Sequence, residues 1–235
     1  MKKKGIYLLA FSPHPTDIEM GIGGTVARLT KEGKKVVYVV ATNGETSTSN
    51  PEMKPDKLAR IRKKEQLAAA KILGVKEVVF LDQPDLGLED TPEFRKEILR
   101  LILQYRPEIV ATHDPYYHIY QSNPDHRVLG RVVLDAVWPT ALAPNAYPDL
   151  QKQGYKLHKV QEIWLFQAEQ SNFFMDITDT LELKRKAINC RGSERAASER
   201  QATEAGVVER ASLAAKGRKY KYGEAFYRLE VLQRL

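Results

Sequence analysis

Two histidines and one aspartate of this chain have the spacing of ligands that could share one metal ion. His14 and Asp17 lie three residues apart, and His126 directly follows Asp125. Two imidazoles and one carboxylate leave coordination positions open for water, which is typical of a hydrolytic zinc site and not of a structural one. Each residue alone also has an ordinary structural explanation, such as a helix cap. The hypothesis therefore depends on the elements that bring them together.

Hydrophobic patterning predicts strands that alternate with helices over most of the chain. Nearly all-apolar strands are expected at 6–11, 36–41, 78–81 and 109–112, and a further strand at 160–166. Helices are expected between them, at 18–32, 55–73, 92–105 and 126–138. This alternation predicts an α/β fold, in which helices cover both faces of a mostly parallel sheet.

The C-terminal part is predicted to extend this fold and to form no second domain. Helical patterns cover 179–189 and 199–215, and no linker or internal repeat interrupts the sequence. We therefore expect a single domain over 1–235, with a C-terminal helical extension at about 178–235.

The loops that follow the predicted strands contain most of the histidines. Ligands of an open parallel α/β sheet bind at the carboxyl ends of its strands. Three loops of the predicted fold lie at that edge, at 12–17, 42–45 and 113–126. His14, His113 and His126 all lie in them. The convergence of His14, Asp17 and His126 on this edge favours a shared metal site over three separate structural roles.

Composition excludes several other classes of protein. Of the 235 residues 43% are hydrophobic, which is ample for a buried core and excludes intrinsic disorder as the main state. The longest apolar runs fall far short of the ~20 residues that a membrane-spanning helix needs. The single Cys190 excludes an internal disulfide and a Cys-rich zinc module. We expect a cytoplasmic protein with no membrane partner.

The formal net charge of +7 is concentrated towards the C-terminus. Between residues 184 and 221 there are eleven Lys or Arg against four Glu. The two kinds of charge alternate along the expected helices, which is typical of a solvated, ion-paired face. Because no recognised nucleic-acid motif accompanies them, we expect no nucleic-acid partner. Binding of nucleic acid or of a protein through these helices stays the competing hypothesis to an enzyme.

Short motifs follow one another in a fixed order along nearly the whole chain. They are His14-Pro15-Thr16-Asp17 with Glu19 and Gly23-Gly24-Thr25 behind it, Pro124-Asp125-His126-Arg127 with Gly130 behind it, and Tyr222 to Phe226. This set resembles the A-H-P-D-D-x-E-x-G-x-G-G-T, H-P-D-H-x-x-x-G and Y-x-E-x-F motifs of the LmbE-like, or PIG-L, family of metal-dependent N-deacetylases. The order of the whole set makes the resemblance specific.

The resemblance implies a Rossmann-like fold and a hydrolytic function. By position in the motifs, His14, Asp17 and His126 would bind zinc or another divalent metal. Zinc-bound water would attack the carbonyl of an acetamide, as in family members that deacetylate N-acetylglucosamine conjugates. The implied partner is a small amino-sugar conjugate, and the implied assembly is a homo-oligomer.

Two positions depart from the family's motifs where the chemistry lies. Thr16 stands in place of the aspartate that acts as general base, and Asn123 replaces the histidine that stabilises the oxyanion. A threonine hydroxyl is too weak an acid or base to move protons near neutral pH, whereas asparagine can still donate a hydrogen bond. The candidates for the missing proton transfer are Asp125, His113, His118 and Glu45.

Four side chains are expected to contact the substrate: Arg62, Glu45, His113 and Tyr116. Arg62 matches a family arginine that could reach a carboxylate, a phosphate or a diol, although a surface ion pair with Glu65 explains it equally well. Tyr116 lies in the loop before His126, where its ring could stack on a sugar.

Three interpretations of the two substitutions stay open. The protein is a hydrolase in which another group moves the proton, a metal-binding relative with a different reaction, or a variant that binds metal and a sugar-like ligand without turnover. The first two are favoured over the third, because a metal site adds little to a sheet that already has a hydrophobic core.

Overall fold

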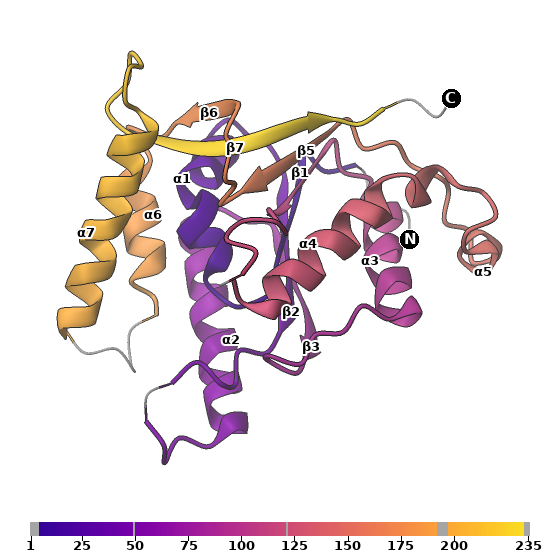
Figure 1. Ribbon diagram of the computed structural model, residues 1–235, viewed down its shortest axis with the longest axis horizontal. Coiled ribbons are helices and arrows are strands. Elements are labelled where there is room, and N and C mark those ends of the chain that lie inside the picture. Colours follow the sequence, from indigo (N-terminus) through magenta and orange to yellow (C-terminus); the bar gives the residue numbers. More distant parts are fainter. Residues whose placement is uncertain (1–4, 49, 121, 192–196, 233–235) are drawn as a thin grey trace.

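A seven-stranded sheet forms the centre of the molecule (Figure 1). The computed structural model describes residues 5–48, 50–120, 122–191 and 197–232, with only the backbone of 197–202. The strands are β1 (Leu8–Ser12), β2 (Val36–Thr42), β3 (Glu77–Gln83), β4 (Ile109–His113), β5 (Glu162–Phe166), β6 (Phe173–Asp176) and β7 (Gly223–Glu230), and their order in the sheet is β3-β2-β1-β4-β5-β7-β6. The first five strands are parallel, and β7 runs antiparallel to both of its neighbours, β5 and β6.

The central strands are buried on both faces, which explains their almost continuous apolar sequences. Every residue of β1, β2 and β4 is buried. A parallel strand covered on both sides has no solvent face, so its side chains do not alternate between polar and apolar. The predicted α/β fold with its mostly parallel sheet is confirmed.

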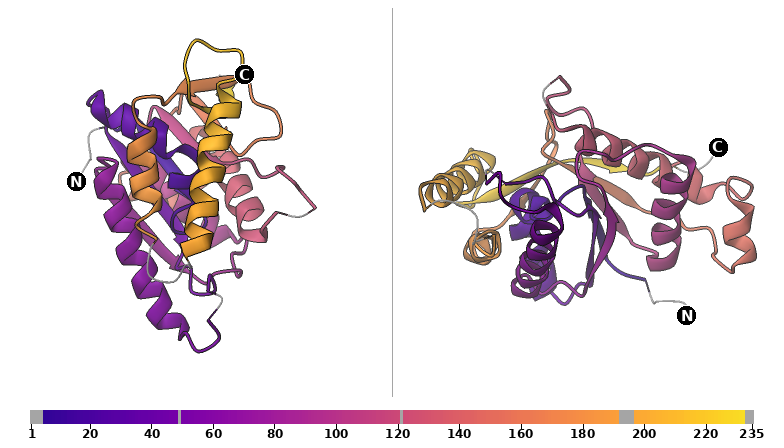
Figure 2. Two further views of the ribbon diagram at one scale, coloured as in Figure 1. Left: turned by 90° about the vertical axis from the view of Figure 1, so that its left-hand side faces the viewer. Right: turned by 90° about the horizontal axis from the view of Figure 1, so that it is seen from below.

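Helices pack against the two faces of the sheet. They are α1 (Asp17–Lys31), α2 (Pro55–Ile72), α3 (Pro92–Tyr105), α4 (Pro124–Val137), α5 (Pro148–Lys152), α6 (Leu181–Ile188) and α7 (Ala197–Ala214), with a 3-10 turn at Thr140–Leu142. Apolar side chains of α1, α2 and α6 join one face of the sheet in a buried cluster, and those of α3 and α4 join the other. Figure 2 shows these two layers on opposite sides of the strands.

The C-terminal region contains the two predicted helices and, after them, strand β7. Residues 192–196 and 233–235 of the predicted extension lie outside the described part. Strands β6 and β7 are absent from the sequence prediction. Strand β7 has the sequence GEAFYRLE, and its second half alternates between partly buried and exposed residues, so charged side chains hide its strand pattern. None of the described helices is both long and apolar enough to cross a membrane.

Candidate metal centre

A tight turn after β1 carries His14 to the carboxyl edge of the sheet. The neighbouring strand fixes this turn, because Thr42 donates hydrogen bonds from its amide and its hydroxyl to the carbonyl of Pro13, at 2.7 and 2.9 Å. Helix α1 begins directly afterwards at Asp17. The local sequence therefore places an imidazole and a carboxylate side by side, three residues apart, at the end of a central strand.

Helix α4 supplies the third side chain of this group. Asn123 caps the helix, with its side-chain oxygen accepting a hydrogen bond from the amide of Asp125 at 2.9 Å, and Pro124 occupies the first turn. His126 follows and turns towards α1. Its Nε2 lies 3.3 Å from His14 Nδ1 and 3.4 Å from Asp17 Oδ2. His14 Nδ1 and Asp17 Oδ2 are 3.1 Å apart.

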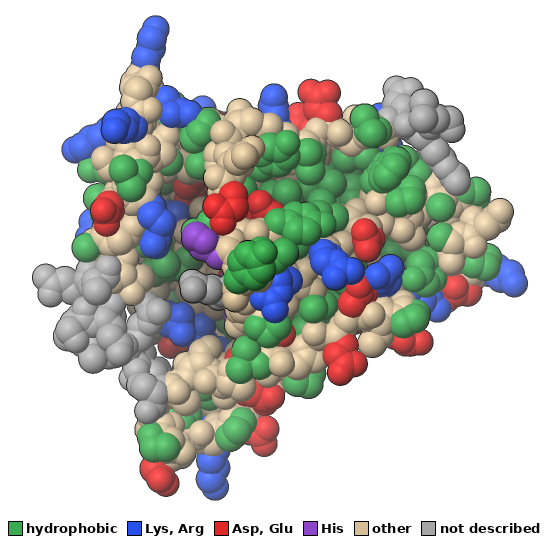
Figure 3. Space-filling view, in the orientation of Figure 1, with side chains coloured by type: hydrophobic (Ala, Val, Ile, Leu, Met, Phe, Trp, Pro, Cys, Tyr) green, Lys and Arg blue, Asp and Glu red, His purple; other side chains and the backbone are tan. Residues whose placement is uncertain are grey.

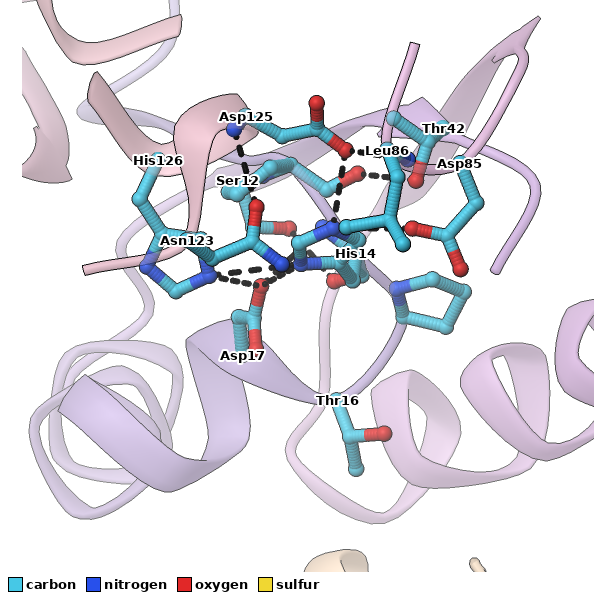
Figure 4. Close-up of polar contacts among 12 residues, drawn as sticks. Ser12, His14, Thr16, Asp17, Thr42, Asp85, Leu86, Asn123, Asp125 and His126 are labelled. Carbon is cyan, nitrogen blue, oxygen red and sulfur yellow. Dashed lines mark hydrogen bonds and ion pairs between the residues drawn. The ribbon is translucent and has the colours of Figure 1, made fainter. Parts of the chain in front are cut away.

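The opposite nitrogen of His14 faces two buried carboxylates. His14 Nε2 lies 3.1 Å from Asp125 Oδ2 and 3.1 Å from Asp85 Oδ1. Asp125 also accepts backbone amides from Leu86 and Leu88, at 2.8 and 3.2 Å. Figure 4 shows His14 between Asp17 and His126 on one side and these two carboxylates on the other.

The carboxylates control the charge of His14. Burial by itself lowers the pKa of this imidazole, but hydrogen bonds with Asp125, Asp17 and Asp85 outweigh it and raise the pKa to about 11. Burial also raises the pKa of Asp17, yet hydrogen bonds with His126 and His14 hold that pKa well below its usual range. The cluster is thus stable only if a positive charge lies within it.

The group of His14, Asp17 and His126 fits a divalent cation. Three ligand atoms of the right kinds point at one another, and each lies within 3.4 Å of the other two. When His14 donates Nε2–H to a carboxylate, its Nδ1 presents a lone pair towards Asp17 and His126. Three lone-pair donors at such distances repel one another unless a proton or a cation lies between them. Asp85 and Asp125 form a second possible ligand group with His14. The carboxylate of Asp125, however, already accepts hydrogen bonds from two backbone amides, which makes it a poorer metal ligand.

Thr16 does not point into this cluster. Its hydroxyl accepts a hydrogen bond from Arg62 Nη2 at 2.9 Å, and the same nitrogen donates to the carbonyl of Pro15 at 2.9 Å. In Figure 4 the Thr16 side chain lies apart from the His and Asp side chains, with its hydroxyl turned away from them. The Arg62 guanidinium is buried and also donates to Glu65, at 3.0 Å.

Two of the predicted proton-transfer candidates are closed off from solvent. Asp125 is fully buried and holds His14. His113 is packed between His126 and Phe166, with ring centroids 4.1 and 4.2 Å away, and neither of its ring nitrogens has a hydrogen-bond partner. Burial, with the charge of His126 next, lowers the pKa of His113 to about 3, so this imidazole is neutral. A substrate could reach it only if neighbouring side chains moved.

The other predicted contacts are more open. Tyr116 is exposed in the loop after β4, and Glu45 is partly buried, with its carboxylate 3.1 Å from Asn43 Nδ2. The contact of Asp85 with His14 is absent from the sequence prediction. The position of Asp85 after a strand of the same sheet edge was the one available signal.

Comparison with known proteins places the chain in a family. Residues 9–137, more than half of the chain, match the PIG-L family, described as GlcNAc-PI de-N-acetylase. The chain belongs to the PIG-L family. Over 187 residues it is 37% identical to diacetylchitobiose deacetylase from Thermococcus kodakarensis, covering 80% of this chain and 69% of that protein.

Two further relatives are also named as deacetylases. The chain is 30% identical over 206 residues to a protein of Bacillus anthracis named as a probable N-acetyl-alpha-D-glucosaminyl L-malate deacetylase 2, covering 79% of this chain and 88% of that one. The N,N'-diacetylchitobiose deacetylase of Pyrococcus horikoshii, solved with an inhibitor, superimposes with a TM-score of 0.90 and 30% identity, over 97% of this chain and 85% of that chain. The relatives named here are thus de-N-acetylases of N-acetylglucosamine-type sugars.

Proposed function

We propose that the protein removes the acetyl group from an N-acetylglucosamine-type sugar, with a divalent cation, zinc in the first place, held by His14, Asp17 and His126. The observation that carries the proposal is the convergence of these three side chains, from the turn after β1, from α1 and from α4, at the carboxyl edge of the sheet. Membership of the PIG-L family supplies the reaction class.

The chain's own residues prepare this site for a metal ion in two ways. A bound zinc ion would supply a Lewis acid and lower the pKa of water to about 7. Asp85 and Asp125 hold Nε2–H of His14 and so fix its ring with Nδ1 directed at Asp17 and His126, where a bound cation would take the place of the Nδ1 proton. The amide of Leu86 donates to Asp125 and fixes that carboxylate in turn.

The weak point of the site is the transfer of a proton to the departing amine. Loss of a general base costs about 10²–10⁴-fold in rate, so Thr16 implies slow turnover. Of the candidates, Glu45 and His118 are accessible to solvent, and His118 lies 3.3 Å from Glu169. The residue before Glu45 is Gly44, which packs closely against Pro15. A Cβ added at Gly44 would lie 3.0 Å from the Pro15 side chain. Glu45 is therefore the accessible carboxylate among these candidates whose neighbour in the chain packs against the turn that carries His14.

Metal analysis tests the proposed ligands. We expect purified protein loaded with zinc to carry close to one equivalent, and His126→Ala to lose it. His158→Ala is the matched control, because His158 bonds the carbonyl of Pro107, next to the amino end of β4. Protein that holds no metal even after loading would contradict the ligand assignment.

Amine release from N,N'-diacetylchitobiose tests the reaction itself. We expect slow release that depends on added zinc and that Glu45→Gln reduces further. Retention of metal and of sugar binding without any release would favour the second candidate function, a ligand-binding member of the family. The substitution at Thr16 is the observation that favours that alternative. Self-association and a cytoplasmic location stay predictions.

A further inference from the structure

The loops at the carboxyl edge of the sheet are acidic, although the whole chain has a net charge of +7. These loops follow the five parallel strands, at 13–16, 43–54, 84–91, 114–123 and 167–172. They carry seven acidic residues and one basic residue: Glu45, Glu52, Asp85, Glu89, Asp90, Asp114 and Glu169 against Lys54. Much of the excess of positive charge lies in the C-terminal region, where residues 184–221 carry eleven Lys or Arg against four Glu.

Two arginines beside the proposed metal group, Arg62 and Arg127, form hydrogen bonds within this chain. Arg62 is buried and donates to Glu65, to the carbonyl of Pro15 and to Thr16. Arg127 donates from Nη1 to the carbonyl and the hydroxyl of Ser122, at 2.5 and 3.2 Å. An anion could reach the buried Arg62 only by displacing one of its bonds, whereas Arg127 is bound through Nη1 alone and to uncharged acceptors.

The same edge exposes large apolar side chains. Leu86 follows β3, and Tyr116 and Tyr120 follow β4, with exposures of 57, 60 and 97%. Figure 3 shows hydrophobic and acidic side chains close together over the loop that leads into α4. The loop itself is anchored, because Glu169 accepts the amide of His118 at 2.8 Å. Exposed rings on an anchored loop suit the C–H face of a pyranose.

We propose that this edge selects uncharged N-acetyl amino sugars and disfavours those that carry a carboxylate or a phosphate. The inference rests on the proposed function and names its substrate class. Clustered charges of one sign at a site attract or repel a charged ligand before contact is made. The acidic loops lower the local concentration of an anionic sugar. The exposed rings of Tyr116 and Tyr120 can stack on an uncharged sugar.

A matched pair of ligands tests the proposal by binding. N-acetylglucosaminyl malate carries two carboxylates, and its dimethyl ester has nearly the same shape without charge. With zinc-loaded protein in calorimetry, we expect the ester to bind about tenfold more tightly at low salt. The ratio of the two affinities should fall towards one at high salt, because the Debye length shrinks from about 10 Å at ~0.1 M salt to about 3 Å at ~1 M. Equal or tighter binding of the diacid at low salt, or no binding of the ester, would overturn the proposal.

Charge-neutralising variants locate the effect. We expect the double variant Glu89→Gln with Glu169→Gln to lower the ratio of ester affinity to diacid affinity. Glu108→Gln, directly before β4 at the opposite edge, should leave this ratio unchanged. An equal effect of Glu108→Gln would mean that overall charge, and not this edge, discriminates. Because binding is measured without turnover, a failure of the proposed deacetylation would show separately, as absence of amine release from the ester while the binding ratio persists.

Discussion

Arg62 donates one hydrogen bond to the hydroxyl of Thr16, at 2.9 Å, and so holds a threonine in left-handed backbone conformation. The φ angle of Thr16 is +82°. A β-branched residue rarely adopts this region, whereas asparagine and aspartate adopt it several times more often. The amide of Thr16 is also held, by Gln66 Oε1 at 2.7 Å. The surroundings of position 16 thus suit a short acidic or amide side chain better than a threonine.

Replacement of Thr16 should therefore separate strain from catalysis. Thr16→Asn keeps a neutral side chain and relieves the backbone, so we expect a gain of about 1 kcal/mol in the free energy of unfolding. Thr16→Asp should relieve the same strain and also add a carboxylate next to Arg62, directly before the proposed ligand Asp17. We expect Thr16→Asp to raise amine release from diacetylchitobiose by about 100-fold.

The comparison of the two variants decides the interpretation. Unfolding in denaturant gives the stability, and steady-state kinetics gives kcat and KM. A gain in rate with Thr16→Asn equal to that with Thr16→Asp would show that strain, and not the lost base, limits turnover. No gain with either variant would favour a changed substrate or reaction.

Asp125 and Asp85 should support metal binding through His14 and not through direct ligation. We expect Asp125→Asn to weaken zinc binding by about 10–100-fold, because it removes the charge that His14 Nε2–H faces. Asp85→Asn should act in the same direction, and the double variant should lose more than either single one. Competition with a chelator measures the affinity. Asp82→Asn is the control, since Asp82 is exposed and pairs with Lys63.

The sequence predicted the framework of the site better than its lining. The strands that precede the loops of His14 and His126 are nearly all apolar, so hydrophobic patterning alone located the edge at which both histidines lie. Asp85 was missed because its role depends on a contact across the sheet with His14, and no local pattern indicates such a contact. The inward turn of His113 was equally invisible, because packing against Phe166 decides it.

Strand β7 shows a second limit of the sequence. Its alternation is obscured by charged residues, such as Arg228, on the exposed side. Glu224 at its start was noted only as part of a motif, and its contacts are with the distant helices α1 and α6. Contacts between segments 200 residues apart follow from tertiary structure and leave no periodic signal.

Glu19 should make the stability of the metal-free protein depend on pH. Burial raises the pKa of this carboxyl to about 7, even though Gln66 donates to it at 2.7 Å. In the unfolded chain the pKa returns to its ordinary value near 4.5. The folded state therefore binds the proton more tightly, and the stability gained from it is complete below the unfolded pKa and is lost as the pH rises through 7.

A neutral variant isolates this contribution. Glu19→Gln has no proton to lose, so we expect it to gain stability relative to the natural protein between about pH 5 and about pH 8. Denaturant unfolding in the presence of a chelator measures the difference at each pH. Glu32→Gln, at the exposed end of α1, should show no such trend. A difference between Glu19→Gln and the natural chain that stays constant with pH would contradict the assigned pKa.

The buried pair of Lys184 in α6 and Glu224 in β7 should contribute strongly to the stability of the fold around α1. The helix is interrupted at Ile22, and the Glu224 carboxylate accepts the freed amides of Gly24 and Thr25 at 2.9 and 2.7 Å. Lys184 Nζ lies 2.6 Å from the same carboxylate, and both side chains are almost fully buried. Lys184→Met would leave a buried charge without its partner, at a cost of about 3–5 kcal/mol in the free energy of unfolding.

The double variant distinguishes loss of the pair from loss of packing. Lys184→Met together with Glu224→Gln removes both charges, so we expect it to recover part of the stability that Lys184→Met loses. Lys186→Met, on the exposed side of the same helix, should change stability by less than about 0.5 kcal/mol. If Lys184→Met cost no more than Lys186→Met, the carboxylate of Glu224 would be stabilised by the amides of α1 alone, and the lysine would be dispensable to the fold.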